Sequence, residues 1–174
     1  MAEIPSTPAD GNTAVWFVPA ITDPSAPSVS DLTAESVVDL SCYLTGDGLN
    51  LTSEQATITD ERLCSTQIFE VPGRKTNTAE VTYIDNTNSP HETDSNEAAE
   101  TLVEGARGYI VTRRGVAYEE PVASDQKVSV WPIEAGEPRE VPPEANSVIR
   151  TIQKLFVTSD VHQKVAVAAG GSGE

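Results

Sequence analysis

The residues that could do chemistry are few and scattered, beginning with two histidines. His91 stands in the segment SPHETD, which lacks the second histidine of the zinc-binding pattern HExxH. His162 comes before Gln163 and Lys164 in a strand-like run, where a solvated face is the expected position. We therefore expect no metal ligand at either histidine.

Serines and carboxylates are abundant, yet no local motif arranges them for catalysis. The chain has no GxSxG nucleophile elbow, no phosphate-binding Walker loop and no GxGxxG sequence. The stretch DNTNSP at 85–90 does not follow the alternating calcium-ligand pattern, because Thr87 stands at its third position. We predict that the protein is not an enzyme and has no catalytic, metal-binding or cofactor-binding residues.

The two cysteines, Cys42 and Cys64, do not form a CxxC metal or redox motif. Both fall in segments with β character, so we expect two buried free thiols. A disulfide between neighbouring strands stays open, because spacing alone does not determine pairing.

The charge is strongly acidic and unevenly distributed. Asp and Glu number 27 against 11 Lys and Arg, which gives a formal net charge of −16, and no base precedes Arg62. Such a surface repels phosphate and disfavours ordinary nucleic-acid binding, although acidity can also serve solubility alone. No run approaches the roughly 18 apolar residues of a membrane span, and the N-terminus does not resemble a secretory signal. We expect a soluble protein made in a cytoplasm.

The 174 residues suit one β-rich domain with loose ends. We predict an extended, Pro-rich N-terminal arm over 1–30, whose apolar patch includes Trp16 and Phe17. A β-sandwich domain is expected over 31–168, followed by a flexible C-terminal tail at 169–174.

Period-two alternation and turn residues mark the expected strands within this domain. A turn of helix is expected at SDLTAES (30–36), and PGRKTNT (72–78) is expected to close a β-hairpin. A Pro-rich loop is expected at 135–145. The predicted strands are 37–44, 62–71, 79–85, 108–118, 126–134, 147–158 and 161–168.

One helix is predicted at about 95–106. Asp94 and Glu97 have the spacing of a capping box, and small apolar residues recur at helical spacing through Ala106. Gly105 and Gly108 can end the helix. Its narrow apolar stripe suits close packing onto a sheet.

Arg113 and Arg114 are adjacent within a predicted strand, so their side chains point to opposite faces. A strand end or an interface would accommodate both. We expect an inter-subunit salt bridge to an acidic part of a neighbour; an ordinary exposed pair is the alternative.

Several segments, taken in order, resemble the major tail protein of long-tailed, non-contractile phages that infect actinobacteria. The resemblance covers residues 13–168, and the order of the segments is more distinctive than any one of them. The segments are DLSCYLTGDGLNLT, ITDERLCSTQIFEVPGR, TLVEGARGYIVTRRGVAY, QKVSVWPIEAGE and IQKLFVTSDVHQKVAVAA.

This resemblance implies two packed antiparallel β-sheets (a β-sandwich or half-barrel) flanked by one α-helix. It also implies a virion protein whose hexameric rings stack into the tail tube, the conduit for DNA ejection, with DNA passing without specific binding. Tape-measure, tail-terminator and distal tail proteins are the other implied partners.

The polar faces of the amphipathic strands supply lumen candidates, with outer solvent-facing positions as the alternative. Arg113, Arg114 and the aromatic patch supply interface candidates. The lumen-facing candidates are Asp39, Glu70, Glu80 and Thr82, and the inter-subunit candidates are Arg113, Arg114, Trp16 and Phe17.

Two other classes compete with this interpretation. A monomeric β-sandwich that binds a surface or a carbohydrate would need exposed aromatic residues grouped at one loop end, and Trp16 and Trp131 lie far apart in sequence. A hydrolase on a β scaffold is weaker still, because no constellation centred on histidine is visible.

Overall fold

The computed structural model of the chain describes residues 3–170, which form eight strands and two short helices. In chain order these are β1 (Thr13–Val18), α1 (Val29–Leu32), β2 (Val38–Asp39), β3 (Leu44–Asp60), β4 (Phe69–Ile84), α2 (Glu97–Thr101), β5 (Arg107–Arg114), β6 (Lys127–Glu140), β7 (Arg150–Val157) and β8 (His162–Ala166).

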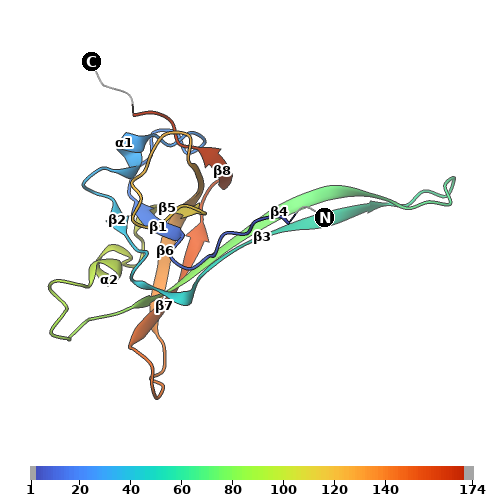
Figure 1. The fold of residues 1–174 in the computed structure, drawn as a ribbon. Coiled ribbons are helices and arrows are strands. Elements are labelled where there is room, and N and C mark those ends of the chain that lie inside the picture. The colour runs from blue at the N-terminus through green and yellow to red at the C-terminus, as the bar shows by residue number, and fades with distance from the viewer. Residues whose placement is uncertain (1–2, 171–174) are drawn as a thin grey trace.

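The strands form one antiparallel sheet in the order β2-β1-β5-β6-β7-β4-β3, and β8 pairs with the beginning of β6. The sheet curls into a half-barrel, with the long β3–β4 hairpin reaching away from the body (Figure 1). The prediction of a mainly β, antiparallel half-barrel with little helix is confirmed. The two expected sheets are hydrogen-bonded into one, because β6 pairs with β5 along one side and with β8 and β7 along the other.

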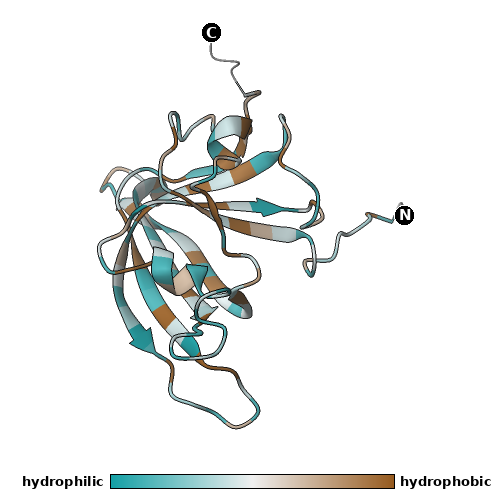
Figure 2. Cartoon of the chain, turned by 90° about the vertical axis from the view of Figure 1, so that its left-hand side faces the viewer, coloured by the Kyte–Doolittle hydropathy of each residue, from teal (hydrophilic) through white to brown (hydrophobic). Residues whose placement is uncertain are grey.

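Apolar side chains are buried on both faces of the body strands. Figure 2 shows hydrophobic residues recurring along these strands. On β1, Val15 and Phe17 join an inner cluster with Trp131, whereas Trp16 joins an outer cluster with Val111. This two-sided burial follows from the side-chain alternation of a strand. We call the sheet face with the inner cluster the inner face and the opposite one the outer face.

The N-terminal region differs from the predicted arm. Residues 3–12 form no helix or strand, but β1 is a strand of the sheet, paired with β5 on one side and β2 on the other. The many prolines suggested an extended arm, but none lies within 13–18, so every residue there can join the ladder. Of the predicted tail at 169–174, residues 171–174 lie outside the described residues.

Both helices are short. The helical turn expected at 30–36 is present as α1. α1 begins with a capping box, in which the Asp31 amide donates to Ser28 Oγ (3.1 Å) and the Ser28 amide donates to Asp31 Oδ2 (3.0 Å). The helix expected at 95–106 covers only 97–101, and its N-cap is Asn96, not Asp94. It ends early because the chain turns to pair with β6: the Gly105 amide donates to the Ala135 carbonyl, and the Ala135 amide donates to the Ala106 carbonyl, both at 2.8 Å. Gly105 has φ 84°, which glycine adopts without strain.

The largest difference is the β3–β4 hairpin. Residues 62–68, expected in a strand, lie in its closing loop, and PGRKTNT, expected as a loop, lies inside β4. Residues 44–60 form a 17-residue strand that the sequence pattern did not reveal. Most of this strand has no core against it, so apolar and polar residues do not alternate along it.

Two further expectations are corrected. β6 continues through the expected Pro-rich loop as far as Glu140, with a register shift between Ala135 and Pro138 that interrupts the ladder. Cys42 and Cys64 are free, as expected, but exposed rather than buried. No helix among the described residues is long and apolar enough to cross a membrane.

Candidate functional site

The projecting part of the β3–β4 hairpin is the most distinctive surface of the chain, and we call residues 52–78 the arm (Figure 1). Five of its large apolar side chains are exposed. They are Ile58, Leu63, Ile68, Phe69 and Val71. Grouped exposure of this kind marks an interaction surface more often than scattered apolar residues do.

Strand register places three of these side chains on one face of the arm. Ile58 lies opposite Val71, and Phe69 lies opposite Asp60, two residues further along β3. Directly opposed residues share a face, and so do residues two apart on one strand. We call Ile58, Phe69 and Val71 the apolar strip.

The apolar strip continues the outer face of the sheet. β3 keeps strict alternation from Leu49 and Leu51, which pack against the inner cluster, so Ile58 falls on the opposite side. In β4 a bulge accompanies the register shift between Gln55 and Thr57. Gly73 sits there, where a Cβ would lie 2.9 Å from the Ala56 carbonyl oxygen, so glycine allows the close approach.

Polar contacts within the arm stabilise its shape without using the apolar strip. Thr52 Oγ1 donates to Thr78 Oγ1 (3.1 Å), and Ser53 Oγ donates to Asn77 Oδ1 (2.7 Å). Such cross-strand pairs are the unit of sheet stabilisation. An arm that needs no apolar packing of its own keeps its apolar residues available for another surface.

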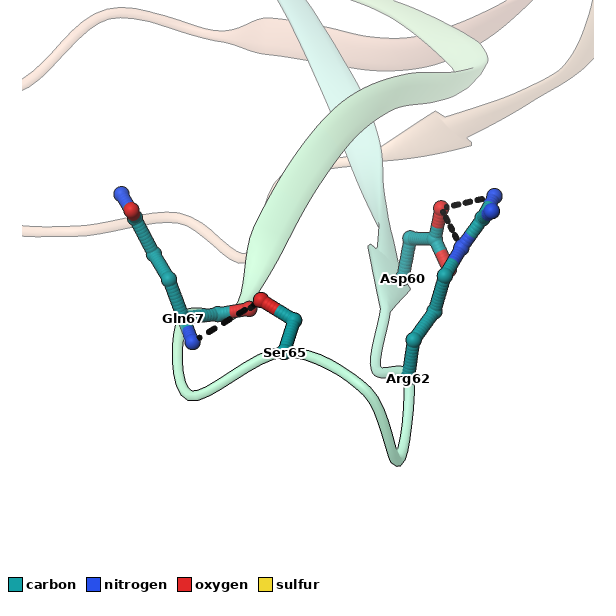
Figure 3. Close-up of polar contacts among 4 residues, drawn as sticks. All are labelled: Asp60, Arg62, Ser65 and Gln67. Carbon is teal, nitrogen blue, oxygen red and sulfur yellow. Dashed lines mark hydrogen bonds and ion pairs between the residues drawn. The ribbon is translucent and has the colours of Figure 1, made fainter.

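The closing loop is organised by two local contacts (Figure 3). The Arg62 guanidinium pairs with the Asp60 carboxylate at 2.9 Å, and this hydrogen bonding raises the pKa of Arg62. The Gln67 amide donates to Ser65 Oγ at 3.1 Å, and that hydroxyl donates back to the Gln67 carbonyl at 3.0 Å. Both contacts are exposed, so they shape the loop more than they stabilise the fold.

The interface predictions for Arg113, Trp16 and Phe17 are corrected, because all three are buried within the chain. Arg113 is 0% exposed, and its guanidinium carbon lies 5.2 Å from the centre of the Trp16 ring. It donates to the carbonyls of Ala117 (3.0 Å) and Tyr118 (3.4 Å) and to Gln126 Oε1 (3.2 Å). Burial lowers the pKa of Arg113, while Glu120 and Asp39 act in the opposite direction.

Arg114 points the other way and is exposed at the end of β5. Among the described residues it forms no salt bridge. The two adjacent arginines therefore differ completely in environment, as strand alternation requires. Arg114 remains an interface candidate.

The structure separates the lumen candidates into different surroundings. Asp39 is half-buried and accepts hydrogen bonds from the Tyr118 hydroxyl and the Ser41 amide, both at 2.9 Å. Glu80 and Thr82 lie on the outer face of β4. The bulge in β4 moves Glu70, opposite Thr59, to the other face of the arm. Glu70 therefore does not share a face with Glu80 and Thr82.

The outer face around Glu80 is not acidic. Register places Lys154 opposite Glu80, and Arg139 approaches Glu80 at 3.9 Å. Arg107 and Glu134 form a further pair at 2.9 Å on the same face. These residues supply three bases and two acids, so the chain's acidity lies elsewhere on its surface.

No group of three or more His, Cys, Asp or Glu residues able to hold a metal ion occurs within residues 3–170. His91 is exposed in the loop before α2, and His162 is half-buried at the start of β8. The features that stand out are thus surfaces for contact: the exposed apolar strip on the arm, and the exposed Arg114 at the end of β5.

A mainly β subunit whose projecting arm carries an exposed apolar strip is suited to contact with other proteins. The model of the phage tail tube protein family matches residues 1–170, and the chain belongs to that family. It is therefore a structural protein of a phage tail and a component of the virion, in a family that is not one of enzymes.

A solved structure has the same fold. It is a chain in the cryo-EM structure of the anti-feeding prophage (AFP) baseplate, 6-fold symmetrised, with a TM-score of 0.50 and 13% sequence identity. The match covers 90% of this chain and 95% of the other. None of the curated proteins matches the chain.

Proposed function

We propose that the chain is the repeating subunit of a tail tube, in which hexameric rings stack around a channel for DNA ejection. The observation that carries this proposal is the arm, which holds an apolar strip in solvent away from the body. Ile58, Phe69 and Val71 are 54%, 52% and 48% exposed, so burying the rest of each contributes about half of the 1.5–3 kcal/mol of a fully buried side chain. A monomer leaves that free energy unused, and an assembly recovers it.

The sheet edges support self-association as well. β3 and β2 stand at the two ends of the strand order, and β3 is 17 residues long. A long unpaired edge is a template for pairing with another chain, and natural proteins rarely leave one uncovered. A closed ring of identical contacts would cover such edges.

The charge supports a conduit through which DNA slides. Six copies would carry 6 × (−16) = −96 formal charges, which repel phosphate instead of holding it. Glu80 and Thr82 remain proposed lumen positions, but the nearly balanced outer face around them means that repulsion must come largely from other parts of the subunit. Glu70, on the other face of the arm, would not line the same surface as Glu80 and Thr82. The Asp39 carboxylate already accepts a hydrogen bond from the Tyr118 hydroxyl.

The remaining expectations belong to this proposal. The tube would contact tape-measure, tail-terminator and distal tail proteins, and the chain would be made in the cytoplasm of an actinobacterial host. The competing monomeric binding module gains no support, because Trp16 and Trp131 are 8% and 4% exposed and form no aromatic platform.

Light scattering and negative-stain microscopy of the purified chain test the proposal. We expect rings or tubes that grow with protein concentration. A species that stays at 18.5 kDa across all concentrations and salt conditions would contradict it.

A further inference from the structure

A half-open trough of about 710 Å³ lies on the inner face of the sheet, against the inner cluster. Its apolar floor includes Val15, Leu49, Leu51 and Trp131. Polar side chains, among them Ser53, form its rim. A concave surface that combines apolar and polar side chains is the general form of a binding site.

The trough is electrically balanced in a chain that is otherwise strongly acidic. Among its lining residues one acid, Asp10, accompanies one base, Arg114. The arm is similar: it has four acids against three bases, leaving 23 acids and eight bases in the rest of the chain. The arm of one copy and the trough of another therefore bring together little net charge, so two acidic chains repel each other only weakly at this contact.

The arm cannot fill the trough of its own chain with the apolar strip. Ser53 lines the trough from the base of the arm, on the inner face, whereas Ile58 and Val71 lie on the outer face. The strip therefore faces away from the trough beside it. A second copy can bring its strip to that trough without this constraint.

We propose that the apolar strip of one copy docks into the trough of a second copy, with Arg114 on the rim beside the acidic residues of the incoming arm. This inference rests on the proposed self-assembly and names the surface that receives the arm. The contact joins two different surfaces of the same chain, so it is heterologous.

Two variants break the two sides of this contact separately. Phe69→Asp with Val71→Asp removes the apolar strip at exposed positions, and Thr59→Asp on the other face of the arm is its control. Ser53→Trp fills the trough. Thr52→Trp, the adjacent exposed residue on the outer face, is the matched control.

The direct measurement uses the exposed thiol at the arm tip. Cys64 carries an environment-sensitive dye in a Cys42→Ser, Ser53→Trp chain, whose apolar strip is unchanged and whose trough is blocked. Adding the unlabelled Phe69→Asp, Val71→Asp chain, whose trough is open, should shift the dye emission to the blue. The shift should be lost when the added chain also carries Ser53→Trp and should persist when it carries Thr52→Trp.

The outcomes separate this inference from the proposed function. If wild-type chains form tubes but the dye shift is the same with an open and a blocked trough, arm-to-trough docking is overturned and self-assembly stands. A wild-type chain that never associates and gives no dye shift overturns both. A blue shift that depends on an open trough supports the docking.

Discussion

Arg113 and Trp16 meet inside one subunit, with the guanidinium carbon 5.2 Å above the indole ring. The arginine also closes the 115–123 loop through the carbonyls of Ala117 and Tyr118. A cation buried against an aromatic face and several acceptors stabilises the monomer and is not free to bind another chain.

Replacing Arg113 with Met should destabilise the monomer by about 3 kcal/mol, because the 115–123 loop loses the hydrogen bonds that its carbonyls accept and Trp16 loses the cation packed over its ring. Denaturant unfolding followed by tryptophan fluorescence measures the change, since Trp16 lies in the contact. Arg114→Glu is the companion variant: it should change the free energy of unfolding by less than about 0.5 kcal/mol and impair assembly instead. Equal effects of both variants on folding would contradict the distinction.

Gly48 should not tolerate a side chain. A Cβ there would collide with the Thr82 carbonyl oxygen and lie 2.6 Å from Thr45 Oγ1. We expect Gly48→Ala to cost about 1–3 kcal/mol, because the backbone must move. Thermal unfolding compares it with Gly46→Ala in the same segment, where a Cβ meets nothing within 4 Å and no loss is expected.

Tyr83 should make the fold sensitive to alkali. Burial, with a smaller effect from Asp85, raises the pKa of Tyr83 from 10.0 to about 12. The folded state therefore holds the phenol proton more tightly, and the stability that this contributes is complete below pH 10 and is lost as the pH rises to 12. Unfolding measured across this window should show a steeper loss for the wild type than for Tyr83→Phe.

Salt should promote assembly. Each copy carries a formal charge of −16, and ions screen repulsion between approaching chains. We expect the concentration needed for assembly to fall when the ionic strength rises from about 0.05 M to about 0.5 M, a range over which the Debye length shortens severalfold. Light scattering at fixed protein concentration measures the effect; assembly that weakens in salt would indicate that ion pairs dominate the contacts.

Sequence patterns predicted the body better than the arm. β5 and β7 pack against neighbouring strands, so alternation revealed them within a few residues of their observed ends. β3 has little core to face beyond Leu51, and its polar residues carried no period-two signal. The three threonines and the isoleucine of LTSEQATIT were the one available clue.

Some features of the site depend on contacts distant in sequence. The bulge at Gly73 reverses which residues share a face, and no local pattern at Glu70 reports that reversal. The adjacent arginines were correctly assigned to opposite faces, but only the packed structure shows that Trp16 lies beneath Arg113. The same packing buries Phe17, which sequence alone had suggested for an interface.

Because the arm and the trough are separate places on one chain, a row of docked copies has two unlike ends. One end always presents a spare arm, and the other an empty trough. Growth by this docking would have a direction, and a protein that stops it would have to present either an arm-like or a trough-like surface. The factors that start and finish such a tube could then not be interchanged.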